Sequence, residues 1–270
     1  TIQGQTAAVQ EQLIAVLSEQ ATNGFEERDD SLLVYFAQDA YTATTEQLVT
    51  HLQQQYNLTI DHQTIRDQNW NAQWESDYRP VVVADFCAIR ATFHPPISTV
   101  QHELIVTPKM SFGTGHHATT YMMLQQLRQL TIADQYGLDY GCGTGVLAIL
   151  AHRLGAAGVD AVDIDKWAYQ NTLENIDLNQ VQDRIQVYEG LLEVVPMRQY
   201  HFILANINRN DILDTLPDMV ERLYVGGYLL TSGFLEQDVP LIVDKAASLE
   251  LQKQQLLQRE QWCCLLFMRQ

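Results

Sequence analysis

From residue 132 onward, the hydrophobic positions of the chain alternate between two kinds of spacing. Short continuous apolar runs, typical of buried strands, are followed by segments with apolar residues every three or four positions, typical of helices. The first predicted strand ends at 141, and the later ones span 159–163, 185–188, 201–206 and 226–232. The predicted helices span 146–154, 166–178, 210–223 and 239–249. This regular alternation predicts an α/β domain built on a parallel sheet.

The end of the chain breaks the alternation. Residues 252–259 and 262–269 both carry strand patterns, and only Glu260-Gln261 joins them. Two strands joined so closely form an antiparallel hairpin. We therefore expect one edge of the sheet to be antiparallel.

The first 66 residues follow a smaller pattern. Helices are predicted at 7–20 and 45–56, and strands at 24–27, 31–37 and 58–66. Thr44 or Thr45 could cap the second helix. One more strand before residue 7 would complete a β-α-β-β-α-β unit. Because only Thr1 and Ile2 remain for that strand, we expect part of it to precede this numbering. We assign residues 1–66 to a small ferredoxin-like α+β domain.

Residues 67–79 have the pattern of a linker helix. Trp70 and Trp74 lie four positions apart, on one face of a helix, and Pro80 ends it. We assign residues 80–270 to the second domain. Its first strands are predicted at 81–86, 88–93 and 103–107.

A glycine-rich turn lies between the first strand of the alternating region and its helix. Gly141, Gly143 and Gly145 stand at alternate positions after Asp139, and a helical pattern begins at Val146. Such glycines let the backbone turn sharply and let a ligand approach bare N–H groups. The helix start beyond them adds unpaired donors and a positive dipole end.

Two kinds of ligand fit such a turn. A dinucleotide site requires G-x-G-x-x-G, but Val146 stands where the third glycine is needed. The observed D-x-G-x-G-x-G resembles the turn of class I S-adenosylmethionine methyltransferases, in which an acid at the end of the next strand holds a ribose. Asp163 stands at that place, and Asp165 is the neighbouring alternative. The closing hairpin is likewise typical of methyltransferases and not of dehydrogenases.

The composition limits the kinds of partner that the protein can bind. The 270 residues are 46% hydrophobic and carry a formal net charge of −17. This charge repels nucleic acid and attracts a basic partner, although an acidic surface also serves solubility. No apolar run is long enough for a transmembrane helix, and no signal peptide is visible. The four cysteines show no C-x-x-C spacing, which favours reduced thiols in a cytoplasmic protein.

Four blocks in order carry a more specific resemblance: N-W-N-A-Q-W at 69–74, F-G-T-G-H-H-A-T-T at 112–120, the glycine turn, and L-A-N-I at 204–207. Together they resemble the ribosomal protein L11 methyltransferase family (PrmA-like). The resemblance covers the second domain and the linker, and the first domain only through its element order. It implies a Rossmann-like class I methyltransferase sheet behind the ferredoxin-like domain.

The resemblance also implies a cofactor, a substrate and a set of residues that bind the cofactor. The methyl donor would be S-adenosylmethionine, and the substrate would be ribosomal protein L11, held by the first domain and methylated on lysine side chains and the N-terminal amine. No membrane and no direct nucleic-acid binding are expected. Eight residues would lie at the cofactor or on its glycine-rich lid: Phe112, Gly113, Gly115, Thr120, Gly141, Gly143, Asp163 and Asn206.

The chain departs from the family pattern around this site. His116 stands where the family commonly has Thr, and Ala118 where it commonly has Pro. Before the lid, Thr107 occupies the place of the family's usual acidic residue. After Asn206-Ile207, this chain has Asn208-Arg209-Asn210 where an apolar residue is more usual. These changes leave the glycine turn intact and fall on the lid and the substrate side.

Methylation needs a neutral amine, whereas a free lysine has a pKa near ~10.4. The site must therefore remove a proton by desolvation or to a nearby acceptor. Asn206 could orient the amine through its side-chain carbonyl, or contact the cofactor alone. His117 could accept a proton or brace the lid. His116 with His117, and His94 with His102, lack the cysteine or acid spacing of a metal site, and no metal is expected.

Three other functions compete with this hypothesis. The nearest is a class I methyltransferase for RNA, a small molecule or another protein, and the acidic first domain argues against RNA. A nicotinamide oxidoreductase is disfavoured by Val146 and by the closing hairpin. A binding module without activity is disfavoured by the intact turn together with Asp163 and Asn206.

Overall fold

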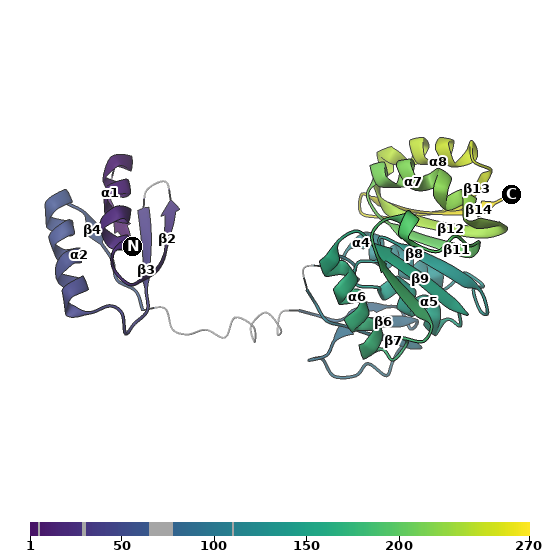
Figure 1. The fold of residues 1–270 in the computed structure, drawn as a ribbon, viewed down its shortest axis with the longest axis horizontal. Coiled ribbons are helices and arrows are strands. Elements are labelled where there is room, and N and C mark those ends of the chain that lie inside the picture. The colour runs from purple at the N-terminus through teal and green to yellow at the C-terminus, as the bar shows by residue number, and fades with distance from the viewer. Residues whose placement is uncertain (5, 29–30, 65–77, 110) are drawn as a thin grey trace. The chain divides into compact units, whose positions relative to one another are not determined.

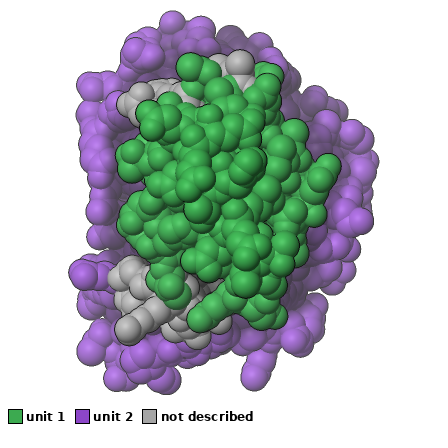
Figure 2. All heavy atoms as spheres, turned by 90° about the vertical axis from the view of Figure 1, so that its left-hand side faces the viewer, with its two compact units in different colours: residues 1–72 green, residues 73–270 purple. Residues whose placement is uncertain are grey.

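The computed structural model describes residues 1–4, 6–28, 31–64, 78–109 and 111–270. The chain forms two compact units, residues 1–72 and 73–270, which are described separately below (Figure 2). The helix predicted at 67–79 falls almost entirely on residues outside those described. The domain boundaries at 66 and 80 therefore stay a prediction.

The first unit contains all six elements of the β-α-β-β-α-β pattern. They are β1 (Ile2–Gln3), α1 (Ala7–Ser18), β2 (Thr22–Arg28), β3 (Ser31–Phe36), α2 (Ala43–Tyr56) and β4 (Thr59–Ile60). The strand order is β2-β3-β1-β4 with antiparallel pairing throughout. This is the ferredoxin-like order, and the short β1 lies at its centre.

Two details of the first unit were predicted wrongly. The strand expected at 58–66 is only two residues long. The cap of α2 is Thr42, not Thr44 or Thr45, because its hydroxyl accepts a hydrogen bond from the Thr45 backbone N–H at 3.4 Å. Thr42 has the extended backbone conformation that an N-cap requires, whereas the two predicted residues already lie inside the helix.

The second unit is organised around a seven-stranded sheet (Figure 1). Its strands are β8 (Tyr136–Tyr140), β9 (Gly158–Asp163), β10 (Ile185–Glu189), β11 (Tyr200–Asn206), β12 (Leu223–Leu235), β13 (Leu251–Arg259) and β14 (Trp262–Arg269), in the order β10-β9-β8-β11-β12-β14-β13. The first five strands of that order pair in parallel, which confirms the predicted class I methyltransferase sheet.

The predicted terminal hairpin is present at one end of the sheet. β14 inserts between β12 and β13 and pairs antiparallel with both. The antiparallel pairing expected at one edge of the sheet is therefore confirmed. The side chains explain why β13, and not β14, is the outermost strand. Residues 263–267 of β14 are buried, whereas β13 is rich in exposed glutamine and tolerates the edge position.

The sheet separates two hydrophobic cores. Helices α4 (Ala118–Leu127), α5 (Val146–Arg153) and α6 (Lys166–Leu178) pack in one core. Helices α7 (Arg209–Glu221) and α8 (Val239–Ala247) pack in the other. Residues of β11 alternate between the two cores, with Phe202 and Leu204 in one and Ile203 and Ala205 in the other. Burial of both faces explains the continuous apolar runs in the sequence.

A smaller sheet precedes the large one in the chain. It consists of β5 (Val81–Val83), β6 (Cys87–Ala91) and β7 (His102–Val106), with β6 and β7 parallel. The first two strands are shorter than predicted. All four cysteines are free and buried. Within the ranges that the structure describes, no helix has the length and apolar character needed to cross a membrane.

Candidate functional site

Three adjacent strands bring the predicted site residues to one edge of the large sheet. β8 lies between β9 and β11, and Tyr140 is level with Val162 on one side and Ala205 on the other. The glycine turn therefore follows β8 directly beside Asp163 and Asn206, the last residues of β9 and β11. The carboxyl ends of parallel strands are the usual ligand edge of such sheets.

The glycine turn is left-handed at each of its three glycines. Gly143 has φ +58°, and a Cβ there would lie 2.3 Å from the carbonyl oxygen of Phe112. A Cβ on Gly145 would lie 2.7 Å from the methyl carbon of Thr172. Glycine is thus required both by the backbone conformation and by the close approach of two other segments.

The expectation of bare N–H groups in this turn is corrected. Every backbone N–H from 141 to 145 has an acceptor within the protein. The acceptors are the carbonyl of Val162, which receives two bonds, the carboxylate of Asp163 and the carbonyls of Phe112 and Cys142. The glycines therefore serve close packing, and polar contacts with a ligand fall to the side chains around the turn.

Asp163 and Asp165 accept different hydrogen bonds and have different roles. The Asp163 carboxylate accepts hydrogen bonds at 2.9 Å from the backbone N–H groups of Gly143 and Asp165, one on each oxygen. Asp163 is partly exposed, so each oxygen keeps a lone pair for a ligand. Asp165 instead caps α6 by accepting from the Trp167 N–H at 2.7 Å. The geometry favours Asp163 over its neighbour as the ligand-facing acid.

The glycine-rich loop before α4 is attached to the turn. Thr144 donates its N–H to the Phe112 carbonyl at 2.9 Å and its hydroxyl to the Gly113 carbonyl at 2.8 Å. Gly113 and Gly115 have φ of +105° and +88°. The Phe112 side chain is 52% exposed and remains available to cover a ligand. The sequence reasoning missed Thr144, although its place between two turn glycines pointed to it.

His117 is held as the N-cap of α4. Its Nδ1 accepts from the Thr119 backbone N–H at 3.3 Å and lies 2.7 Å from the Thr119 hydroxyl. The ring packs edge-on between Phe112 and Trp262, at centroid distances of 5.2 and 4.7 Å. In the neutral ring the lone pair is thus used by the helix cap, and the proton is on Nε2. This arrangement supports the bracing role over proton acceptance.

Asn206 leaves one polar atom for a ligand. Its Nδ2 donates to the Thr120 hydroxyl at 3.2 Å, which joins two of the predicted cofactor residues. Its Oδ1 is buried and has no hydrogen-bond partner among the described residues. An orphaned buried carbonyl costs free energy unless a donor reaches it, so the site is suited to a ligand that carries an N–H or O–H group.

Asp139 lies behind the turn, fully buried. One oxygen accepts from the Ala148 N–H at 3.1 Å, and the other has no partner within the part of the chain described. Burial raises the pKa of Asp139 to about 7, with a smaller contribution from the charge of Asp163, while the Ala148 bond opposes the rise. The carboxyl therefore keeps its proton to a much higher pH than an ordinary aspartate does.

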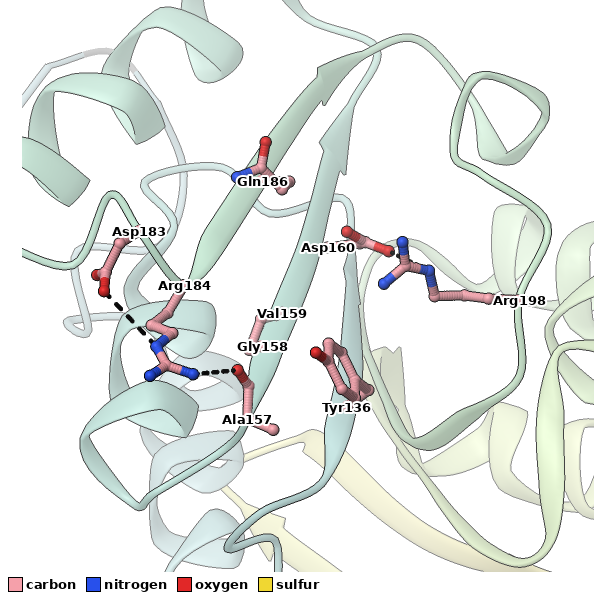
Figure 3. A pocket seen from close by; sticks show the side chains of 9 residues that line it. All are labelled: Tyr136, Ala157, Gly158, Val159, Asp160, Asp183, Arg184, Gln186 and Arg198. Atoms are coloured by element: carbon pink, nitrogen blue, oxygen red, sulfur yellow. Dashed lines mark hydrogen bonds and ion pairs between the residues drawn. The ribbon is translucent and has the colours of Figure 1, made fainter.

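A separate hollow of about 350 Å³ lies near the starts of strands β8 and β9, away from the glycine turn (Figure 3). Tyr136, Asp160, Arg184 and Arg198 line it. Asp160 is bonded to the Tyr200 hydroxyl at 2.6 Å and faces Arg198 at 3.5 Å. The charged groups that line the hollow are thus already paired. The hollow lies at the opposite ends of the strands from the glycine turn.

The family model described as Ribosomal protein L11 methyltransferase (PrmA) matches residues 2–270. The chain belongs to the ribosomal protein L11 methyltransferase family. The resemblance seen in the four sequence blocks is thereby confirmed over nearly the whole chain, including the first unit.

Individual relatives agree. A ribosomal protein L11 methyltransferase of Porphyromonas gingivalis is 45% identical over 205 residues, 74% of this chain and 70% of that protein. One from Bacteroides fragilis is 34% identical over 266 residues, 97% of this chain and 95% of the relative. The crystal structure of a ribosomal protein L11 methylase from Lactobacillus delbrueckii subsp. bulgaricus has a TM-score of 0.66 at 27% identity, covering 71% of this chain and 99% of the other.

Three of the departures from the L11 methyltransferase family pattern, at His116, Thr107 and Asn208, have local explanations. His116 places its Nε2 2.8 Å from the carbonyl oxygen of Arg79, at the end of the predicted linker. The Thr107 hydroxyl donates to the Glu174 carboxylate at 3.2 Å, where an acidic side chain would meet a like charge. Asn208 caps α7 by accepting from the Asp211 N–H at 3.1 Å. The departures are therefore used in the packing around the site.

Proposed function

We propose that this chain transfers methyl groups from S-adenosylmethionine to amines of ribosomal protein L11, namely lysine side chains and the N-terminal amine. The observation that carries the proposal is the arrangement at one sheet edge. There, an acid, a glycine turn and an orphaned amide oxygen meet in a chain of the L11 methyltransferase family. The same edge is where parallel α/β sheets bind ligands.

The residues around the turn fit this cofactor. Asp163 accepts the two ribose hydroxyls through its remaining lone pairs, because a carboxylate is a strong double acceptor. Gly141 and Gly143 let Ile207 and the Phe112 backbone pack closely against the turn beside the cofactor, and Thr120 fixes Asn206. Phe112, Gly113 and Gly115 form the lid. Ile164, which directly follows Asp163, is 68% exposed and offers apolar cover for the adenine.

When bound, S-adenosylmethionine supplies an electrophilic methyl group on a sulfonium. The chain contributes position and exclusion of water. Asn206 accepts an N–H of the incoming amine through Oδ1 and so aligns its lone pair. Removal of the amine from water favours its neutral form. His117 holds the start of α4 and the Phe112 side chain in place.

Charge supports a basic protein as the substrate. The net charge of the chain is −17, and residues 1–66 contain nine acids against Arg28 and Arg66. A negative surface accelerates encounter with a basic partner and disfavours nucleic acid. Together with four free cysteines, a ribosomal substrate also supports a cytoplasmic location.

The test combines two measurements. Isothermal titration with S-adenosylmethionine comes first, followed by mass spectrometry of purified ribosomal protein L11 after incubation with enzyme and cofactor. We expect mass gains in steps of one methyl, and peptide mapping should place them on lysines and the N-terminus. The Asn206→Ala variant is the matched control. Cofactor binding without methylation of L11 would leave a methyltransferase of another substrate, and no cofactor binding would overturn the proposal as a whole.

A further inference from the structure

The outer edge of β7 is completed by side chains instead of a strand. β6 pairs with one side of β7. On the other side lie Asn171 and Asn175 of α6 and Asn179, the C-cap residue of that helix, four positions apart and almost fully buried. Asn179 accepts from the Ile105 N–H at 3.0 Å and donates to the Ile105 carbonyl at 2.7 Å. An amide side chain thus makes the same pair of bonds that a neighbouring strand would make.

The same pattern continues at the end of β7. Asn175 accepts from the Thr107 N–H at 2.8 Å, and Asn171 donates to the Thr107 carbonyl at 3.2 Å. Glu174 adds an ion pair with Lys109 and accepts the Thr107 hydroxyl. Helix α6 therefore holds the segment that leads from β7 into the glycine-rich loop.

Helix α6 also holds the glycine turn. Asn175 donates its Nδ2 to the Thr144 carbonyl at 2.8 Å, and the Thr172 hydroxyl donates to the Gly143 carbonyl at 2.8 Å. Asn175 is thus bonded to both segments, with Thr107 on one side of its amide and Thr144 on the other. Its side chain is fully buried, so water does not compete for these bonds.

Thr144 closes the connection. Its N–H and hydroxyl hold the carbonyls of Phe112 and Gly113, the first residues of the lid. The lid is therefore bonded to the turn, the turn to Asn175, and Asn175 to the strand that leads into the lid. A change in the position of any one of these segments must be accommodated by the others.

We propose that Asn175 is a positioning residue that couples the lid to the cofactor turn, so that cofactor binding and ordering of the lid are linked through its side-chain amide. The inference rests on the proposed function, since it takes the glycine turn as the S-adenosylmethionine site. Asn175 itself touches no reacting atom.

Asn179 provides a matched control. It lies one helical turn away on the same face, is also buried and holds the same strand, but its side chain bonds to Ile105 and to the Asn175 backbone and not to the turn. Asn175→Ala and Asn179→Ala each remove one buried amide and leave backbone groups of β7 or its continuation unpaired. Their effects on stability should be similar, whereas only the first uncouples the turn.

The experiment measures S-adenosylmethionine affinity by titration, and hydrogen exchange of residues 111–117 with and without S-adenosylhomocysteine. In the wild type and in Asn179→Ala, we expect the ligand to slow exchange of the lid. In Asn175→Ala, we expect that slowing to disappear and the dissociation constant to rise about tenfold or more relative to Asn179→Ala, because only Asn175 is bonded to the turn, through the Thr144 carbonyl. Equal behaviour of the two variants would overturn the proposal and leave a purely structural role.

A second variant decides the matter if Asn175→Ala does not fold. Asn175→Asp keeps the shape and the acceptor for the Thr107 N–H but, when ionised, lacks the donor for the Thr144 carbonyl. We expect it to weaken cofactor binding at pH 8, and wild-type binding there would refute the coupling. A wild-type chain that fails to bind S-adenosylmethionine would instead refute the proposed function, which separates the two failures.

Discussion

The sharpest test of the glycine turn is Gly143→Ala. Gly143 has φ +58°, in the left-handed region that costs a residue with a Cβ about 1–2 kcal/mol. The added Cβ would lie 2.3 Å from the Phe112 carbonyl oxygen, well inside contact distance. That oxygen belongs to the backbone of the lid and accepts the Thr144 N–H, so the lid must move.

Gly226→Ala separates the two contributions. Gly226 has φ +79°, but a Cβ there meets no atom within 4 Å. It carries the backbone strain without the clash. Forcing a methyl group into a packed region costs about 1–3 kcal/mol. For a unit of this size, that difference should lower the melting temperature of Gly143→Ala by a further ~2–12 °C relative to Gly226→Ala.

Thermal unfolding and titration with S-adenosylmethionine provide the assay. We expect Gly226→Ala to bind the cofactor like the wild type, because it lies away from the site edge in β12. We expect Gly143→Ala to lose binding by tenfold or more, on the order of 1.4 kcal/mol, because the lid and the turn separate. Equal melting temperatures and equal affinities for the two variants would refute the claim that a Cβ at Gly143 clashes with the Phe112 carbonyl oxygen.

Three further predictions concern titratable side chains. Asp163→Asn replaces one acceptor by a donor facing a backbone N–H, and calorimetry should show affinity for S-adenosylmethionine falling about 10- to 100-fold; unchanged affinity would contradict the assignment. The folded pKa of Asp139, about 7, exceeds its ordinary 3.8, so its contribution to the free energy of unfolding decreases as pH rises from about 4 to 7. Denaturant titrations should show a shallower decrease in Asp139→Asn. His117→Asn keeps a capping oxygen, so the pH profile of kcat should match wild type; loss of a titrating limb would restore His117 as the proton acceptor.

Local patterns in the sequence were enough for the α/β alternation, the glycine turn and the family. Each depends on residues close together in the chain: apolar spacing for the strands and helices, and D-x-G-x-G-x-G for the turn. The ferredoxin-like order could be predicted for the same reason, whereas the exact cap, Thr42, could not. Three threonines stand together at 42–45, around one alanine, and only the backbone conformation distinguishes them.

The parts that needed the tertiary structure are contacts between distant segments. The insertion of β14 between β12 and β13 depends on which strand can bury both faces, which the hairpin pattern alone does not specify. Thr107 and Asn175 are 68 positions apart, and nothing local indicates that a helix amide will complete a strand edge.

The turn N–H groups illustrate the same division. The sequence by itself determined that glycines stand at 141, 143 and 145 and that an acid follows at 163. Only the folded chain decided that those N–H groups are taken by the protein itself and that the side-chain oxygen of Asn206 is left without a partner among the described residues. A backbone donor bonds to the nearest acceptor in space, and spatial neighbours are fixed by packing, not by sequence distance.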